Sequence, residues 1–147
     1  MPGKGFTLIE LLVVTSIIAI ISSIGLSTYR GVVVNARDSS RKQDLTQLGT
    51  ALELYFQKNG RYIQGSGSCS QDTPTFYTQI ASYLTGEVPK DPSTGVNYCY
   101  ISVNNGQAFR LFAKLENPND SDRLTGCISS VYDYTIVSPN LSAACPP

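Results

Sequence analysis

Histidine is absent from the 147-residue chain, and charged residues are scarce, at 15% of the total with a net charge of zero. Without histidine the chain lacks the commonest general base near neutral pH and the usual nitrogen ligand of zinc sites. The remaining acids, lysines and tyrosines form no catalytic motif, and a neutral chain gives no reason to expect general nucleic-acid binding. The length fits one domain. We therefore expect a protein that is not an enzyme and that needs no cofactor.

The four cysteines lack the spacing of a metal site, because no Cys-x-x-Cys pair occurs among them. An even number of cysteines in a small exported domain instead predicts two disulfide bonds, with three possible pairings. Four buried thiols in a cytosolic protein are the alternative, and the N-terminal sequence favours export. The predicted disulfide residues are Cys69, Cys99, Cys127 and Cys145.

Proline is also absent between residues 6 and 73, and the first part of this stretch is strongly apolar. Residues 6–26 read FTLIELLVVTSIIAIISSIGL, with Glu10 as the one charged residue. A helix of this length spans roughly 32 Å, which matches a hydrocarbon core of about 30 Å. A cleaved secretory signal has a shorter apolar run and a small-residue cleavage site. The run therefore predicts a retained membrane anchor.

Glu10 is costly in such an anchor, since a carboxylate inside a spanning helix costs about 2.5–3.5 kcal/mol on insertion scales. The next basic residue is Arg30, which is too far along the helix to neutralise it. A free α-amine on another copy of the chain is the nearest candidate. If the chain were cut after Gly5, Phe6 would carry that amine.

Residues 4–12, KGFTLIELL, resemble the class III signal of type IV pilins and type II secretion pseudopilins. The resemblance implies that prepilin peptidase cuts between Gly5 and Phe6 and that Phe6 is then N-methylated. It also implies that Glu10 pairs with the N-terminus of a neighbouring subunit in a helical homo-oligomer. The further partners implied are an assembly ATPase and an inner-membrane platform protein.

This resemblance divides the chain into a leader (residues 1–5), a transmembrane and assembly helix (6–29) and an extracytoplasmic globular domain (30–147). We expect a single pass through the cytoplasmic (inner) membrane, in contact with lipid, before assembly, and an extracytoplasmic or cell-surface filament afterwards. A surface pilus and a secretion pseudopilus both remain open. The alternative function is that of a minor or tip pilin with a role in adhesion or DNA uptake.

The anchor is expected to continue as an amphipathic helix to about residue 58. Leu45, Leu48, Leu52 and Tyr55 recur at spacings of three and four, and Asn59-Gly60 supplies a stop signal. The leucine stripe is expected to be core. Its polar faces include Arg37, Arg41 and Lys42. Together with Arg30, these residues could contact nucleic acid, but a solvated or interfacial helix face is the simpler interpretation.

The remaining sequence predicts a short helix over residues 75–84 and strands over 96–103, 108–116 and near 126–137. Asn104-Asn105-Gly106 is a hairpin signal between the first two strands. The fold class is therefore α+β, with a long N-terminal helix packed on a small antiparallel sheet of three to four strands. Residues 84–116 resemble the corresponding part of the major pseudopilin of type II secretion.

One turn is rich in oxygen ligands. Asn117, Asn119, Asp120 and Asp122 carry side chains of the kind that Ca²⁺ prefers, and major pseudopilins bind calcium near their sheet. The spacing matches no EF-hand, and such Asx-rich segments are usually only turns. These four residues are the weak candidates for a metal site.

Overall fold

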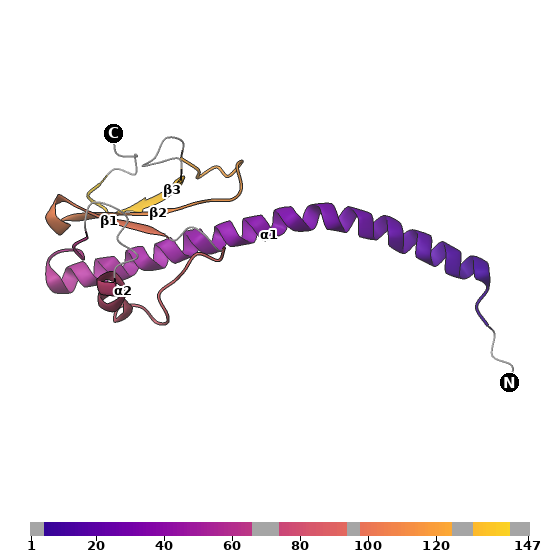
Figure 1. Cartoon of the computed structure of the whole chain (residues 1–147), viewed down its shortest axis with the longest axis horizontal. Helices are drawn as coiled ribbons and strands as arrows, with labels where there is room; N and C mark the ends of the chain where they lie inside the picture. The colour runs from indigo at the N-terminus through magenta and orange to yellow at the C-terminus, as the bar shows by residue number, and fades with distance from the viewer. Residues whose placement is uncertain (1–4, 66–73, 94–97, 125–130, 142–147) are drawn as a thin grey trace. The chain divides into compact units, whose positions relative to one another are not determined.

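A computed structural model describes residues 5–65, 74–93, 98–124 and 131–141, without the side chains of residues 24–28, 74 and 75. Figure 1 shows a long helix and a small sheet. This arrangement confirms the predicted α+β class. The elements are α1 (Leu8–Asn59), α2 (Pro74–Ala81), β1 (Cys99–Val103), the 3-10 turn η2 (Asn104–Gly106), β2 (Ala108–Ala113) and β3 (Tyr134–Val137).

The predicted long helix is confirmed as α1, which contains no proline. It ends at the predicted stop, where Gly60 takes a positive φ of 70° and its N–H donates to the Phe56 carbonyl at 2.7 Å. Glycine accepts this left-handed conformation without a steric cost, which is why it commonly follows a helix.

The chain forms two compact units, Met1–Asn35 and Ala36–Pro147. The first unit contains the apolar part of α1, and most of the large apolar side chains that the structure describes there are exposed, for example Leu8 at 81% and Ile21 at 66%. Among the residues that the structure describes, no helix combines the length and apolar character that crossing a membrane requires. The second unit contains the rest of α1, α2 and the sheet.

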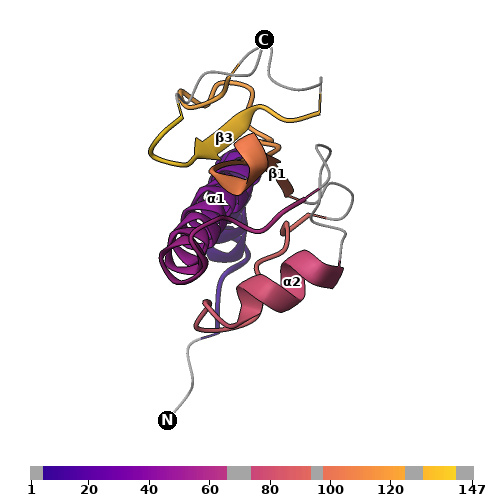
Figure 2. The same ribbon diagram turned by 90° about the vertical axis from the view of Figure 1, so that its left-hand side faces the viewer.

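The core of the second unit forms between the leucine stripe of α1 and one face of the sheet. Leu45, Leu48 and Leu52 are fully buried, as expected of a helix that covers a core. The strands pair antiparallel in the order β1-β2-β3, and Leu111 lies between Tyr100 and Ile136. In Figure 2, α2 lies on a different side of α1 from β3. The sheet residues in this core cluster include Tyr100, Phe109, Leu111 and Ala113, and Tyr98, just before β1, joins them.

The opposite face of the sheet carries Cys99, Ile101 and Val103, which confirms the predicted alternation along β1. Cys99 is fully buried there and pairs in register with Phe112, which is also fully buried. The other three cysteines lie outside the described residues, so the two disulfide bonds stay a prediction.

Two elements end earlier than the sequence predicts. β2 stops at Ala113 because the N–H of Leu115 donates to a side chain, the Asp133 carboxylate, at 2.7 Å instead of to a strand partner. The second helix stops at Ala81 because the chain continues as tight turns, with Tyr83 N–H donating to the Ile80 carbonyl. In the first place a side-chain oxygen replaces the strand partner, and in the second a backbone hydrogen bond of shorter spacing replaces the helical one.

The hairpin signal is confirmed between β1 and β2. Asn104, Asn105 and Gly106 all have positive φ, and the Gly106 carbonyl accepts the Tyr62 N–H at 2.8 Å. A Cβ atom on Gly106 would lie 3.0 Å from the Tyr62 carbonyl oxygen. The chain that leaves α1 therefore packs directly on this turn and requires a glycine there.

Candidate functional site

The N-terminus of α1 is capped by two side chains that exchange hydrogen bonds. Thr7 precedes the first helical residue, and its Oγ1 accepts the Glu10 N–H at 3.3 Å. In return, Glu10 Oε2 accepts the Thr7 N–H at 2.9 Å and the Thr7 hydroxyl at 2.8 Å. This is the capping box that a Thr-x-x-Glu sequence forms at a helix N-terminus. Both residues are exposed.

The surroundings of Glu10 are otherwise apolar. A small concavity of about 300 Å³ is lined by Glu10 and by Phe6, Ile9, Val13 and Val14. The Gly5–Phe6 bond predicted for cleavage lies before the helix, and Phe6 is 89% exposed. The structure therefore places an accessible peptide bond and an exposed carboxylate within one turn of each other along the chain.

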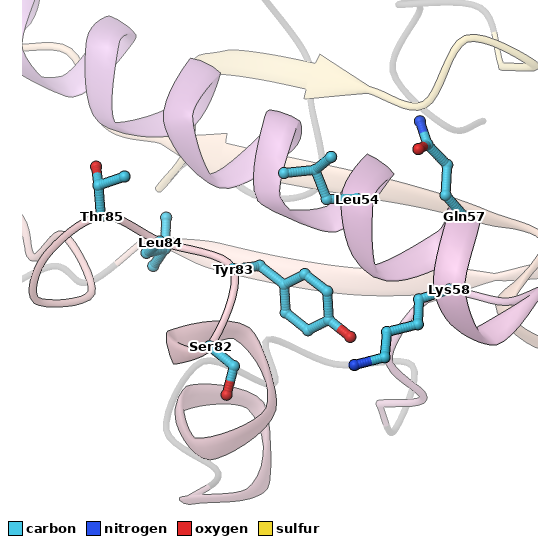
Figure 3. A pocket seen from close by; sticks show the side chains of 7 residues that line it. All are labelled: Leu54, Gln57, Lys58, Ser82, Tyr83, Leu84 and Thr85. Carbon is cyan, nitrogen blue, oxygen red and sulfur yellow. The ribbon is translucent and has the colours of Figure 1, made fainter.

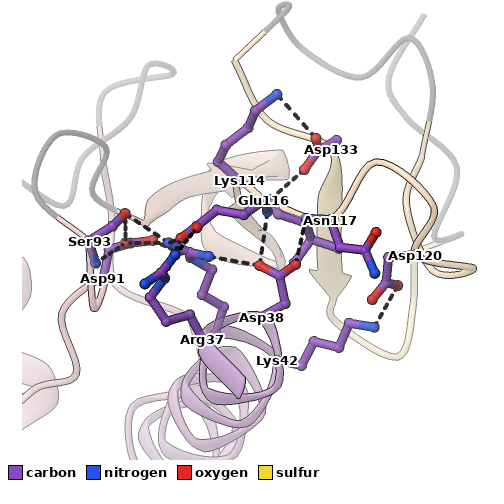
Figure 4. Close-up of polar contacts among 12 residues, drawn as sticks. Arg37, Asp38, Lys42, Asp91, Ser93, Lys114, Glu116, Asn117, Asp120 and Asp133 are labelled. Atoms are coloured by element: carbon purple, nitrogen blue, oxygen red, sulfur yellow. Dashed lines mark hydrogen bonds and ion pairs between the residues drawn. The ribbon is translucent and has the colours of Figure 1, made fainter. Parts of the chain in front are cut away.

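A second group of polar residues surrounds a buried guanidinium in the second unit (Figure 4). Arg41 is 1% exposed; its Nε donates to Asp91 Oδ2 at 2.8 Å and its Nη1 to Asp38 Oδ1 at 2.7 Å. Its Nη2 donates to Asp91 Oδ1, Ser93 and Glu116. We name this group the Arg41 cluster; its members are Arg37, Asp38, Arg41, Asp91, Ser93 and Glu116.

The prediction that Arg41 lies on a solvated or interfacial helix face is therefore wrong. A buried cation is costly unless opposite charges and hydrogen bonds compensate it. Three carboxylates do so here, and two of them, those of Asp91 and Glu116, lie 50 and 75 residues later in the chain. The hydrogen bonds that Arg41 donates to these acids, those to Asp91 first, raise the pKa of Arg41 despite its burial.

Two acids of the cluster, Glu116 and Asp91, have lowered pKa values and are held in their charged forms. The hydrogen bond from Arg37 lowers the pKa of Glu116, and Arg41 adds to this effect. Burial raises the pKa of Asp91, but the hydrogen bonds from Arg41 and Ser93 together bring it below the ordinary value.

Asp38 also holds the chain that leaves the sheet. Its two oxygens accept the N–H groups of Glu116 at 2.9 Å and Asn117 at 2.8 Å. The sequence contains one indication that Asp38 belongs to the Arg41 cluster. Asp38 lies three residues before Arg41, a spacing at which two side chains meet on a helix. No sequence pattern joins either residue to Asp91.

Two comparisons with known proteins bear on the N-terminal capping box and on the whole chain. The family model described as the prokaryotic N-terminal methylation motif matches residues 3–26. Prepilin peptidase-dependent protein D of Escherichia coli (strain K12) is 36% identical over 106 residues, which cover 70% of this chain and 73% of that protein.

The chain belongs to the pilin-like proteins with an N-terminal methylation motif. The resemblance seen in residues 4–12 is thereby confirmed, and Glu10 and Phe6 lie within the matched motif. No solved structure gives a significant match to the chain.

The oxygen-rich turn of this pilin-like protein holds an ammonium group. Lys42 Nζ lies 2.7 Å from Asp120 Oδ1 and 2.7 Å from Asp122 Oδ2. Asn117 Oδ1 accepts the N–H of Asn119, the fourth candidate ligand, at 2.9 Å. Over the described parts of the chain, no group of three or more histidine, cysteine, aspartate or glutamate residues could hold a metal ion.

Most of the basic residues that could contact nucleic acid form ion pairs within the fold. Arg37 pairs with Glu116, Arg41 lies at the centre of the cluster, and Lys42 pairs with the oxygen-rich turn. Arg30 belongs to the first unit and is exposed. Charges already neutralised within the fold offer little to a phosphate backbone.

An open cleft of about 500 Å³ lies between the end of α1 and the turn after α2 (Figure 3). Lys58 Nζ lies 5.8 Å from the centre of the Tyr83 ring, and Leu54 is 44% exposed. Sequence reasoning missed this cleft because its walls come from separate segments. Its lining residues are Leu54, Gln57, Lys58, Ser82, Tyr83, Leu84 and Thr85.

Proposed function

We propose that this pilin-like protein is a structural subunit of a type IV pilus-like filament or a type II secretion pseudopilus. Prepilin peptidase cuts it after Gly5 and methylates Phe6. Residues 6–29 hold it in the inner membrane before processing. An assembly ATPase and a platform protein then bring it into an extracytoplasmic filament.

The observation that carries this proposal is the state of Glu10 at the start of α1. Its Oε2 is used by Thr7, whereas Oε1 accepts no hydrogen bond from any described residue. An exposed carboxylate oxygen in an apolar setting favours a cationic partner. The α-amine of Phe6 on a neighbouring copy, created by cleavage after Gly5, has the right charge.

Exposure of the apolar side chains supports the same proposal. Burying such surface against other copies is favourable, and an isolated subunit in water leaves it uncovered. The match of residues 3–26 to the methylation motif supports anchoring and processing. The name of the Escherichia coli relative supports dependence on prepilin peptidase.

The test is to produce the protein in cells with and without prepilin peptidase and to measure its intact mass without reducing agent. We expect a chain that starts at methylated Phe6 and is four hydrogens lighter than the reduced form, because of the two predicted disulfides. An uncut N-terminus in cells with active peptidase would contradict the processing pathway.

Glu10→Ala and Glu10→Gln then test the pairing. Both are expected to be expressed and cut normally but to give no filaments in electron micrographs of sheared cell-surface fractions. Glu87→Ala, which removes an exposed acid in the second unit, is the matched control and should assemble normally. Normal filaments from Glu10→Ala would refute the pairing.

A minor or tip subunit with a binding role is the alternative, and the open cleft beside Tyr83 favours it. Quantitative mass spectrometry of isolated filaments separates the two functions. A body subunit makes up most of the filament mass, whereas a tip subunit is present in a few copies.

A further inference from the structure

We propose that the positive charge of Lys42 holds together the two acids of the turn of residues 117–122 and so closes this turn. The Lys42 ammonium takes the position that a divalent cation would otherwise occupy in a turn of this composition. We name this arrangement the lysine latch, formed by Lys42, Asp120 and Asp122. The inference concerns the folded second unit and does not depend on filament assembly.

Geometry carries the proposal. The two carboxylates converge on one atom, with Asp120 Oδ1 and Asp122 Oδ2 each 2.7 Å from Lys42 Nζ. The same ammonium lies 5.6 Å from the centre of the Tyr134 ring, a distance at which a cation is attracted to the ring face. Lys42 thus joins α1 to the turn after β2 and to β3.

The turn has a fixed form that brings the two acids together. Asp120 Oδ1 accepts the Asp122 N–H at 2.9 Å, and the Arg123 N–H donates to the Asp120 carbonyl at 3.2 Å. Two carboxylates held around one point repel each other unless a positive charge lies between them. In this chain the ammonium is at that point.

A divalent cation would need the same oxygens. Ca²⁺ takes six to eight oxygen ligands, and Asx-rich turns supply them through side chains, carbonyls and water. The hydrogen bonds from Lys42 lower the pKa of Asp120, so this acid is charged at neutral pH and pairs with the ammonium. Closure of the turn therefore requires the charge of Lys42 and no metal.

The experiment measures thermal unfolding of the full-length protein in detergent, in excess EGTA and in millimolar Ca²⁺. Lys42→Met keeps the length of the side chain and removes its charge. Lys58→Met is the matched control, because Lys58 also lies on α1 over a tyrosine ring but forms no ion pair with a described carboxylate. Since unfolding is measured on subunits, a failure of the proposed filament function would not affect the result.

We expect the wild-type midpoint to be the same in EGTA and Ca²⁺. Lys42→Met should melt about 3–6 °C lower in EGTA and recover most of this loss in Ca²⁺, which can enter the vacated position. Lys58→Met should behave as the wild type does. The variant Lys42→Met/Asp120→Asn/Asp122→Asn, which lacks all three charges, should fold and have the same midpoint in EGTA and in Ca²⁺.

Three results would overturn the proposal. A wild-type midpoint that rises in Ca²⁺ would mean that the turn takes a metal itself. An unchanged midpoint for Lys42→Met in EGTA would mean that the ammonium does not close the turn. A lowered midpoint for Lys42→Met that Ca²⁺ does not restore would mean that the turn does not bind a cation at the position of the Lys42 ammonium.

Discussion

Arg41 and Asp91 form a two-pronged ion pair between the long helix and a loop 50 residues further along the chain, with N–O distances of 2.8 and 3.0 Å. Such bidentate pairs fix geometry as well as charge. Asp91 lies between Pro89 and Pro92 in a segment without regular secondary structure, so this pair determines where the segment lies against α1.

Arg41→Met should destabilise the second unit strongly. It removes the one cation shared by three carboxylates, and breaking a buried pair in this way typically costs about 3–5 kcal/mol. Arg37→Met is the control, since the Arg37 side chain is 36% exposed and exposed pairs contribute about 1 kcal/mol or less. Urea unfolding followed by circular dichroism gives both values. Equal losses would show that burial of Arg41 is not what makes its charge important.

Stability should fall at acid pH. A carboxyl with a folded pKa below its unfolded value contributes stability above the unfolded pKa and loses it as the pH falls through the folded pKa. We expect a constant melting temperature from pH 8 to about pH 5 and a decline below about pH 4. In the second unit, the described acids with lowered pKa values are Asp91, Glu116 and Asp120.

Asp44 acts in the opposite sense, because burial raises its pKa above the ordinary value. This single carboxyl gains stability as the pH falls through its folded pKa, and it opposes the three lowered acids. Melting curves in Asp44→Asn should therefore show a steeper acid loss than the wild type. An acid loss in Asp44→Asn that is no steeper than that of the wild type would contradict the raised pKa of Asp44.

Gly106→Ala adds only one methyl group but should lower the free energy of unfolding of the second unit. The residue has φ +81°, and an added Cβ would meet the Tyr62 carbonyl oxygen at 3.0 Å. A left-handed residue combined with such a contact costs about 1–3 kcal/mol. Gly86→Ala, where nothing lies within 4 Å of the new atom and φ is not positive, should be nearly neutral in the same urea experiment.

Thr7→Val should loosen the first turn of α1. Valine keeps the shape of threonine but removes the hydroxyl that pairs with Glu10, and loss of such a cap costs about 1 kcal/mol. Amide hydrogen exchange at residues 10–12, measured by NMR in detergent micelles, should accelerate several-fold. Thr7→Ser keeps the hydroxyl and should exchange at the wild-type rate, and equal acceleration in both variants would contradict the capping role.

Local signals in the sequence predicted the long helix, its stop at Gly60 and the hairpin at Asn104–Gly106, because each depends on neighbouring residues. The N-terminal motif with Phe6 and Glu10 was equally local. The Arg41 cluster could not be predicted in this way. Its partners at Asp91 and Glu116 are distant in sequence, and an arginine on the polar side of a helix resembles any solvated residue. The same limit hid the contact of Lys42 with Asp120.

The long separation between Arg41 and its partners also orders events during synthesis. Arg41 is made with Asp38 already beside it, whereas Asp91 is added 50 residues later and Glu116 75 residues later. Until those two acids have been added, part of the guanidinium must remain hydrated. Contacts between distant residues form late, since the chain between them must be closed first. The complete cluster can therefore form only after β1 and β2 have been translated, and a nascent chain stopped before Glu116 would carry Arg41 without its full set of carboxylates.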